Sequence, residues 1–300
     1  MNFHIWGLSG SITTEHEEQL AFAEERLWHW VNAFDTTCNR FRSDSEISRL
    51  NSGHDEPVVV SDTLALALDA AFDAARVTDG LCDPTVLSSL LALGYDRDYD
   101  ELAGRDDVVL ARTARSPGLG AVTFDREART VKLAKGCLLD LGASAKALVA
   151  DLVANDVAPR NGVVVELGGD VAVRGRGPQG PWVIGVSDSL LITGREPRVA
   201  FTNGGIATSS SVARSWNASG QRVNHIIDPR TGSWAHGVYA TATVSAASCV
   251  IANAFATAAL LWDEDAAFRI AQAGWSGRLV RRDGSVEFVG GWPEEEELTT

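Results

Sequence analysis

The sequence has no paired cysteine motif and no apolar run long enough to cross a membrane. Its four cysteines are widely spaced without a CxxC pair, which argues against a zinc site and a disulfide framework and fits a reducing cytosol. The longest apolar run, Cys249–Trp262, contains Asn253 and is shorter than the roughly 20 residues of a transmembrane helix. The first residues, MNFHIWGLSGSITTE, lack the basic and apolar regions of a signal peptide, so we expect a cytoplasmic protein without a membrane span.

The sequence also contains few basic residues relative to acidic ones. The chain has 26 Lys and Arg against 40 Asp and Glu, a formal net charge of −14 over 300 residues. Such a chain repels the phosphate backbone that dominates nucleic-acid affinity, so DNA and RNA are excluded as expected partners. The acidic stretch Glu294–Glu297 is typical of a solvated end. With 45% hydrophobic residues, the rest of the chain can bury a substantial core.

Apolar periodicity predicts two long amphipathic helices in the first third of the chain. The first would begin at a capping box formed by Thr14 and Glu17, and the second would follow Ser61 and end before Gly80. Their apolar stripes are Leu20, Leu27, Val31 and Phe34 in the first helix, and Leu64, Leu68, Phe72 and Ala75 in the second.

Short β-forming runs dominate from about residue 107 onward. We expect strands at 108–111, 121–124, 131–133, 163–167, 182–186 and 238–244, helices at 143–153 and 250–262, and a final hairpin of 277–280 and 286–289. The stretch Gly168-Gly169-Asp170 lacks the GxGxxG spacing of a dinucleotide-binding Rossmann turn. Because strands and helices do not alternate regularly, and no linker divides the chain, we predict one α+β unit over residues 1–300, with an acidic tail from about 293.

Three pairs of polar residues are candidates for chemistry. Asp140, predicted at the end of a strand, and Lys146, in the first turns of a helix, suit a phosphate, or they are a helix cap and a solvated lysine. His225 with Asp228 suits acid–base work better than an isolated histidine, which is more often structural.

The third pair lies in an otherwise apolar helix. Asn253 and Thr257 are four residues apart, so they share one helical face. Their oxygens either form internal hydrogen bonds or face a hard cation such as Mg²⁺.

Taken in order from about Phe34 to Trp262, these motifs resemble the ApbE family, the FAD:protein FMN transferases. The matching segments are Ser43–Asn51, Asp79–Thr85, Asp140–Ala147, Gly168–Asp170, Thr208-Ser209, His225–Gly232 and Ala252–Thr257. The resemblance implies an α+β fold of two interlocked lobes with FAD in the cleft between them. It also implies a Mg²⁺-dependent transfer of FMN from FAD to a threonine or serine hydroxyl in a flavinylation motif of an acceptor protein, with release of AMP.

Site residues follow from the same resemblance, position by position. The metal ligands would be Ala143, through its carbonyl, Asn253 and Thr257, and the catalytic residues His225 and Asp228. The flavin and adenine contacts would be Phe41, Leu81, Cys82, Asp83, Asp140, Lys146, Thr208 and Ile227.

Departures from the family pattern leave alternatives open. Asn253 stands where the family usually has aspartate, so a neutral carbonyl replaces an anionic ligand and Mg²⁺ should bind more weakly. Phe41 stands for a tyrosine and keeps only the stacking face. The alternatives to a transferase are an FAD pyrophosphatase, which would give FMN and AMP, and a catalytically weak FAD-binding protein.

Overall fold

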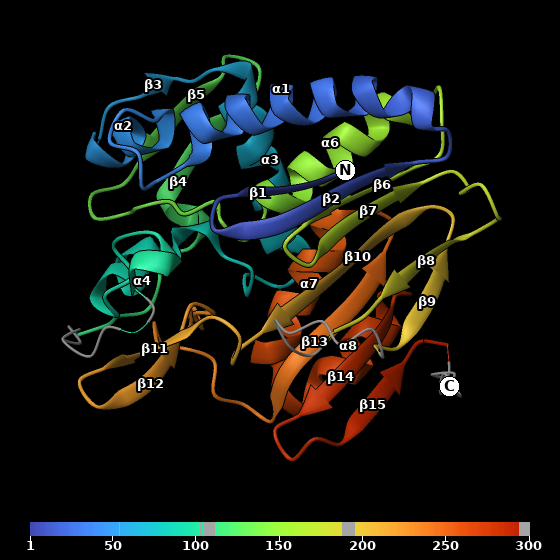
Figure 1. Ribbon diagram of the computed structural model, residues 1–300. Helices are drawn as coiled ribbons and strands as arrows, with labels where there is room; N and C mark the ends of the chain where they lie inside the picture. The colour runs from blue at the N-terminus through green and yellow to red at the C-terminus, as the bar shows by residue number, and fades with distance from the viewer. Residues whose placement is uncertain (54, 103, 105–111, 188–195, 294–300) are drawn as a thin grey trace.

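The computed structural model describes residues 1–53, 55–102, 104, 112–187 and 196–293. These residues form an eight-stranded antiparallel sheet in the order β1-β2-β6-β7-β10-β13-β14-β15, with helices packed along it (Figure 1). The α+β class is therefore confirmed. The expected strand at 108–111 and the acidic stretch Glu294–Glu297 lie outside the described residues.

The helical elements and strands divide the described chain as follows. The helices are α1 Leu20–Cys38, α2 Glu46–Ser52, α3 Asp62–Val77, α4 Leu87–Ala92, α5 Tyr99–Leu102, α6 Ala145–Val157, α7 Cys249–Trp262 and α8 Ala266–Gln272, with 3-10 turns η1 Glu17–Gln19, η2 Pro84–Val86, η3 Leu119–Ala121 and η4 Asp263–Asp265. The strands are β1 Asn2–Ile5, β2 Leu8–Thr14, β3 Val58–Val59, β4 Val122–Asp125, β5 Thr130–Leu133, β6 Val163–Leu167, β7 Asp170–Arg174, β8 Trp182–Gly185, β9 Arg198–Phe201, β10 Gly204–Ser210, β11 Ser215–Ala218, β12 Gln221–Asn224, β13 Tyr239–Ala246, β14 Ser276–Arg281 and β15 Val286–Val289.

Most of the predicted elements are present. Helix α3 begins after Ser61, whose hydroxyl accepts the Leu64 N–H as an N-cap, and the predicted stripes of α1 and α3 are buried except for the half-buried Leu20. Strand β6 and the final hairpin also match their predicted positions.

Two local predictions are wrong. Thr14 ends β2 and its hydroxyl donates to the His16 carbonyl, so Thr14 and Glu17 form no capping box, and α1 begins at Leu20 without a side-chain cap. This hydrogen bond instead stabilises the bend that follows β2. Asp140 lies in irregular chain after β5, not at the end of a strand, because a turn at residues 135–136 ends the β structure.

The two faces of the sheet bury different sets of residues. Val163, Val165 and Leu167 of β6 pack into the core shared with α1, α3 and α6. The intervening Val164 packs with Trp182 and Phe201, on the side of the small β8–β9 sheet. This alternation follows from the two-residue period of a strand, and it makes β6 buried on both faces.

Helix α7 is held against the sheet by a close backbone approach and by a buried carboxylate. A Cβ atom on Gly205 of β10 would lie 2.2 Å from the Cys249 backbone nitrogen, so only glycine fits there. Asp151 of α6 accepts the backbone N–H groups of Cys249 and Val250 at 3.1 and 3.0 Å and pairs with Arg174 at 3.0 Å. An anion at a helix N-terminus is favourable, so Asp151 fixes the position of α7.

Two further findings concern the cysteines and the length of the helices. All four cysteines, Cys38, Cys82, Cys137 and Cys249, are buried and free of disulfide bonds. Within the described ranges, no helix combines the length and the apolar character needed to cross a membrane.

Candidate functional site

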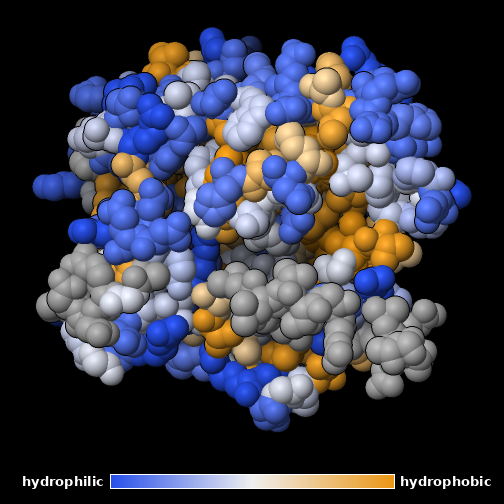
Figure 2. Space-filling view, in the orientation of Figure 1, coloured by the Kyte–Doolittle hydropathy of each residue, from blue (hydrophilic) through white to orange (hydrophobic). Residues whose placement is uncertain are grey.

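The structure contains a cavity of about 920 Å³. Its walls come from β2, β6, β7, β8, β10, the N-terminus of α6, α7 and the loop that follows α1. Figure 2 shows apolar residues between polar ones in the middle of the face that is turned toward the viewer. A volume of this size accommodates a large organic ligand.

The structure brings the predicted site residues together in this cavity, with the exception of Asp228. Its lining includes Phe41, Leu81, Cys82, Asp83, Asp140, Ala143, Lys146, Thr208, His225, Ile227, Asn253 and Thr257.

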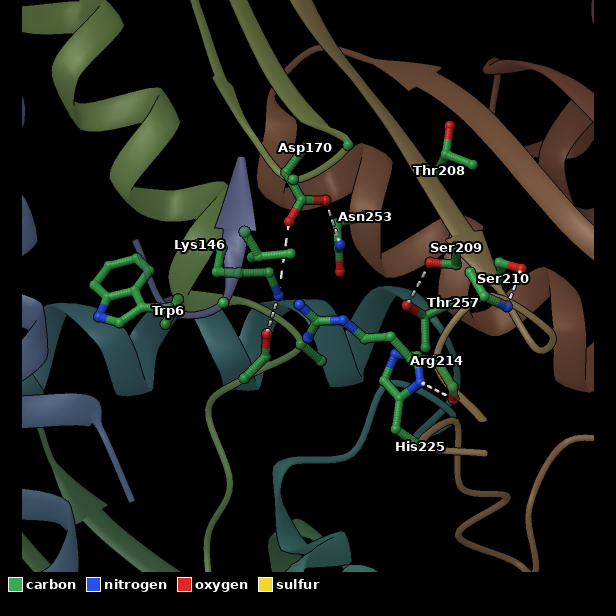
Figure 3. A pocket seen from close by; sticks show the side chains of 18 of the residues that line it. Trp6, Lys146, Asp170, Thr208, Ser209, Ser210, Arg214, His225, Asn253 and Thr257 are labelled. Atoms are coloured by element: carbon green, nitrogen blue, oxygen red, sulfur yellow. Dashed lines mark hydrogen bonds and ion pairs between the residues drawn. The ribbon is translucent and has the colours of Figure 1, made fainter. Parts of the chain in front are cut away.

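One corner of the cavity is polar. Lys146, the second residue of α6, donates from Nζ to the Gly142 carbonyl at 2.7 Å and lies 3.8 Å from Asp170 Oδ2 (Figure 3). Asn253 Nδ2 donates to Asp170 Oδ1 at 2.6 Å. Asp170 is only 3% exposed, and burial raises its pKa, although Lys146 opposes that shift.

The oxygens at this corner suit a hard cation. Asn253 Oδ1 is buried and has no hydrogen-bond partner in the part of the chain that the structure describes. Thr257 Oγ1 lies 3.0 Å from Ser209 Oγ, so each hydroxyl can keep a lone pair free. No three His, Cys, Asp or Glu side chains cluster as metal ligands among the described residues. The ligands implied by the family resemblance are the Ala143 carbonyl, the Asn253 amide and the Thr257 hydroxyl. All three supply oxygen atoms, which Mg²⁺ prefers, and the unpartnered Asn253 oxygen fits such a site.

Another part of the lining, the aromatic end, contains Phe41 and Tyr95. The Arg40 guanidinium lies 4.0 Å from the Phe41 ring centre and 4.8 Å from that of Tyr95, and its Nε donates to Asp140 Oδ2 at 2.5 Å. Asp140 also accepts the Gly142 N–H at 2.6 Å. Arg40 Nη2 is buried without a hydrogen-bond partner among the residues described. Flat rings beside a free donor suit a planar heteroaromatic ligand.

Several lining residues have local roles of their own. Asp83 Oδ1 accepts the N–H and the hydroxyl of Thr85, both at 2.8 Å, and so caps η2. Thr208 Oγ1 lies 2.9 Å from Thr243 Oγ1 across two strands. Burial raises the pKa of Cys82 to about 12, which keeps its thiol protonated and unreactive at neutral pH.

His225 presents a free ring nitrogen. Its Nδ1 lies 3.3 Å from the Arg214 carbonyl, which can only accept, so the bond requires the proton on Nδ1 and leaves the Nε2 lone pair available. Burial first, then the charges of Arg214 and Lys146, lower the pKa of His225 to about 3.

The His225 imidazole should therefore stay neutral in the free protein down to about pH 4. An unfolded histidine gains its proton near the ordinary value of 6.5, so between 6.5 and 3 the unfolded state binds a proton that the native state does not. Stability should fall as the pH is lowered through this window. Imidazole ¹⁵N NMR, with His225→Gln for assignment, checks the value. Half-protonation near pH 6.5 would contradict it.

Asp228 lies apart from the cavity. Its carboxylate is engaged by Arg230, with the backbone N–H at 2.9 Å and two side-chain nitrogens each at 2.9 Å, and its carbonyl accepts the Gly232 N–H at 2.7 Å. These bonds are those of an Asx-type turn.

Arg40, Asp170 and Arg214 are among the polar residues that line the cavity without having been predicted as site residues. Asp170 lay within a matched segment, and Arg40 is adjacent to Phe41, so both had a signal in the sequence. Arg214 had none, because only the fold brings it beside Lys146 and His225.

Comparisons with known proteins find relatives in both sequence and fold. The chain is 28% identical over 280 residues to an FAD:protein FMN transferase of Haemophilus influenzae, covering 90% of this chain and 80% of that one. It is 29% identical over 257 residues to one of Vibrio cholerae, covering 83% and 75%. The fold is similar to an ApbE protein of Thermotoga maritima, with 25% identity, a TM-score of 0.84 and 96% coverage of both chains. The fold is also similar to a flavinyl transferase of Pseudomonas stutzeri, with 20% identity, a TM-score of 0.78, and coverage of 96% of this chain and 92% of that one. Because the family model matches residues 6–277, the chain belongs to the ApbE family.

Proposed function

We propose that this protein is an FAD:protein FMN transferase, which moves the FMN half of FAD to a threonine or serine hydroxyl of an acceptor protein and releases AMP. The observation that carries the proposal is one cavity, in a chain of the ApbE family, that joins an aromatic end to a polar corner holding Lys146, His225 and Asn253.

FAD has two flat ring systems joined by a pyrophosphate, and the cavity offers both kinds of surface. Phe41 and Tyr95 supply ring faces beside the Arg40 donor. Lys146, at the N-terminal turn of α6, supplies a positive charge where helix N–H groups also favour anions. We infer that a ring of FAD lies at the aromatic end and the pyrophosphate in the polar corner.

Ala143, Asn253 and Thr257 are the residues that would hold Mg²⁺. Such an ion, when bound, neutralises charge on the phosphates during phosphoryl transfer. Asn253 contributes only a neutral oxygen, and Asp170 supports it by accepting the other half of the amide. This support fixes which way the amide faces, since its NH₂ group must point at the carboxylate.

The acceptor hydroxyl attacks the FMN phosphorus, and the bond between that phosphorus and the AMP oxygen breaks. His225 Nε2 is the free lone pair placed to take the hydroxyl proton. Its low pKa in the free protein reflects burial and two nearby cations, and a bound pyrophosphate would offset the cationic part of that shift. AMP leaves as an anion that Lys146 stabilises. For Asp228 we propose a supporting role, as the turn residue that orients the loop behind His225.

The test is incubation of the protein with FAD, Mg²⁺ and a candidate acceptor that carries a flavinylation motif. Mass spectrometry should find the FMN mass on the acceptor and none on a variant whose target threonine is valine. FAD cleaved to FMN and AMP with an unmodified acceptor would instead identify a pyrophosphatase. FAD bound but unchanged would identify a flavin-binding protein.

A further inference from the structure

We propose that Arg214 is a second phosphate-binding cation, which acts with Lys146 to hold the pyrophosphate of the dinucleotide substrate. The inference rests on the proposed function, because it takes FAD as the ligand. Arg214 lies within the residues that the family model matches but outside the short motifs named in the sequence analysis, and the structure places it in the lining of the cavity.

Arg214 is fixed at the cavity by its neighbours. It lies in the bend between β10 and β11, half-buried, with its guanidinium carbon 5.6 Å from the Tyr99 ring centre. Its backbone carbonyl is the acceptor for His225. In the close-up, the guanidinium extends toward the amine of Lys146, beside the His225 ring (Figure 3). The side chain therefore approaches the proposed reacting groups.

Arg214 lacks a close carboxylate partner in the described part of the chain, although Asp170 interacts with it electrostatically from beyond ion-pair distance. No described Asp or Glu forms an ion pair with it, whereas Arg40, the other arginine of the cavity lining, is paired with Asp140. Among the described carboxylates, Lys146 forms an ion pair with Asp170 at 3.8 Å, and Asp170 already accepts a hydrogen bond from Asn253. Burial lowers the pKa of Lys146, and Arg214 lowers it further against the opposing effect of Asp170.

Two like charges beside each other in a half-buried site are unfavourable unless an anion joins them. A pyrophosphate meets this need, because it carries charge on both phosphates and a guanidinium binds phosphate oxygens in a fork. Because Asn253 is neutral, the polar corner attracts a metal ion less strongly than it would with an aspartate at this position. Side-chain cations therefore carry much of the charge neutralisation, and FAD should still bind when divalent cations are chelated.

The experiment compares FAD with riboflavin, which has no phosphate, by flavin fluorescence titration in EDTA. In Arg214→Gln, FAD binding should weaken by about tenfold while riboflavin binding stays within about twofold, since one charge-assisted phosphate contact is lost. Raising the salt concentration should weaken FAD binding less in the variant than in the unmodified protein. Arg214→Lys should restore most of the affinity.

The matched control is Arg126→Gln, which removes an exposed arginine paired with Asp69 and should change neither ligand. Equal loss of FAD and riboflavin in Arg214→Gln, or unchanged FAD binding in a variant whose circular dichroism matches the unmodified protein, would overturn the inference. An unmodified protein that binds FAD but does not transfer FMN would overturn the proposed function and leave the phosphate contact standing.

Discussion

Asp151→Ala should lower the free energy of unfolding by about 3–5 kcal/mol, as expected when one partner of a buried ion pair is removed. The carboxylate is buried, and it accepts two backbone N–H groups at the start of α7 as well as the Arg174 side chain. Alanine would leave Arg174 without its carboxylate and two buried donors without acceptors. Because α7 carries Asn253 and Thr257, the polar corner of the cavity should loosen as well.

Urea denaturation measures this effect. Asp151→Asn keeps one acceptor oxygen and should lose less stability than alanine. Asp73→Ala removes an exposed carboxylate paired with Arg76 and should cost no more than about 1 kcal/mol. A loss below about 1 kcal/mol for Asp151→Ala would show that α7 is held by its apolar packing alone.

Asn253→Asp should make the stability of the protein depend on divalent cations. The Asn253 amide nitrogen lies 2.6 Å from an Asp170 oxygen, so aspartate would place two carboxylates together in a buried corner. With EDTA present we expect a loss of about 2–4 kcal/mol, because the nearest cation, Lys146, cannot balance both charges. Millimolar Mg²⁺ should recover much of that loss, since an ion that binds only the native state stabilises it.

Thermal unfolding with EDTA or with Mg²⁺ measures the dependence. Asn253→Ala is the control, because it removes the bond to Asp170 without adding a charge and should respond little to Mg²⁺. If the aspartate variant is as stable as the unmodified protein in EDTA, or responds to Mg²⁺ no more than the alanine variant, the corner is not a cation site. A rise in FMN transfer that accompanies tighter cation binding would identify the metal as the limiting element.

Elements whose signal is local could be predicted from the sequence. The stripe of α3 and the apolar run of β6 match the structure because burial follows the period of each element. Strand β10 was not predicted, because Gly204–Ser210 is rich in glycine and serine, which are more typical of loops than of strands. Tertiary packing explains its small residues. The backbone of α7 packs directly against Gly205, and the Ser209 hydroxyl forms a hydrogen bond with that of Thr257.

The site was predictable as a set of residues but not as an arrangement. The family pattern identified residues that line one cavity, while the role of each residue stays a prediction. Asp228 is paired with Arg230 and does not line the cavity, although it is three residues from His225 in the sequence. Arg214 and Lys146 are far apart in the sequence, yet the fold brings their side chains close together.

The order of strands in the main sheet has a consequence for how the protein is made. The cavity needs β2, near the start of the chain, and α7, near its end, with β6, β7 and β10 between them. A nascent chain that has reached residue 245 already carries Lys146, Arg214 and His225 but not Asn253 or Thr257. During synthesis on the ribosome, Lys146, Arg214 and His225 therefore leave the exit tunnel before Asn253 and Thr257, and these two parts of the polar corner can meet only after α7 has emerged.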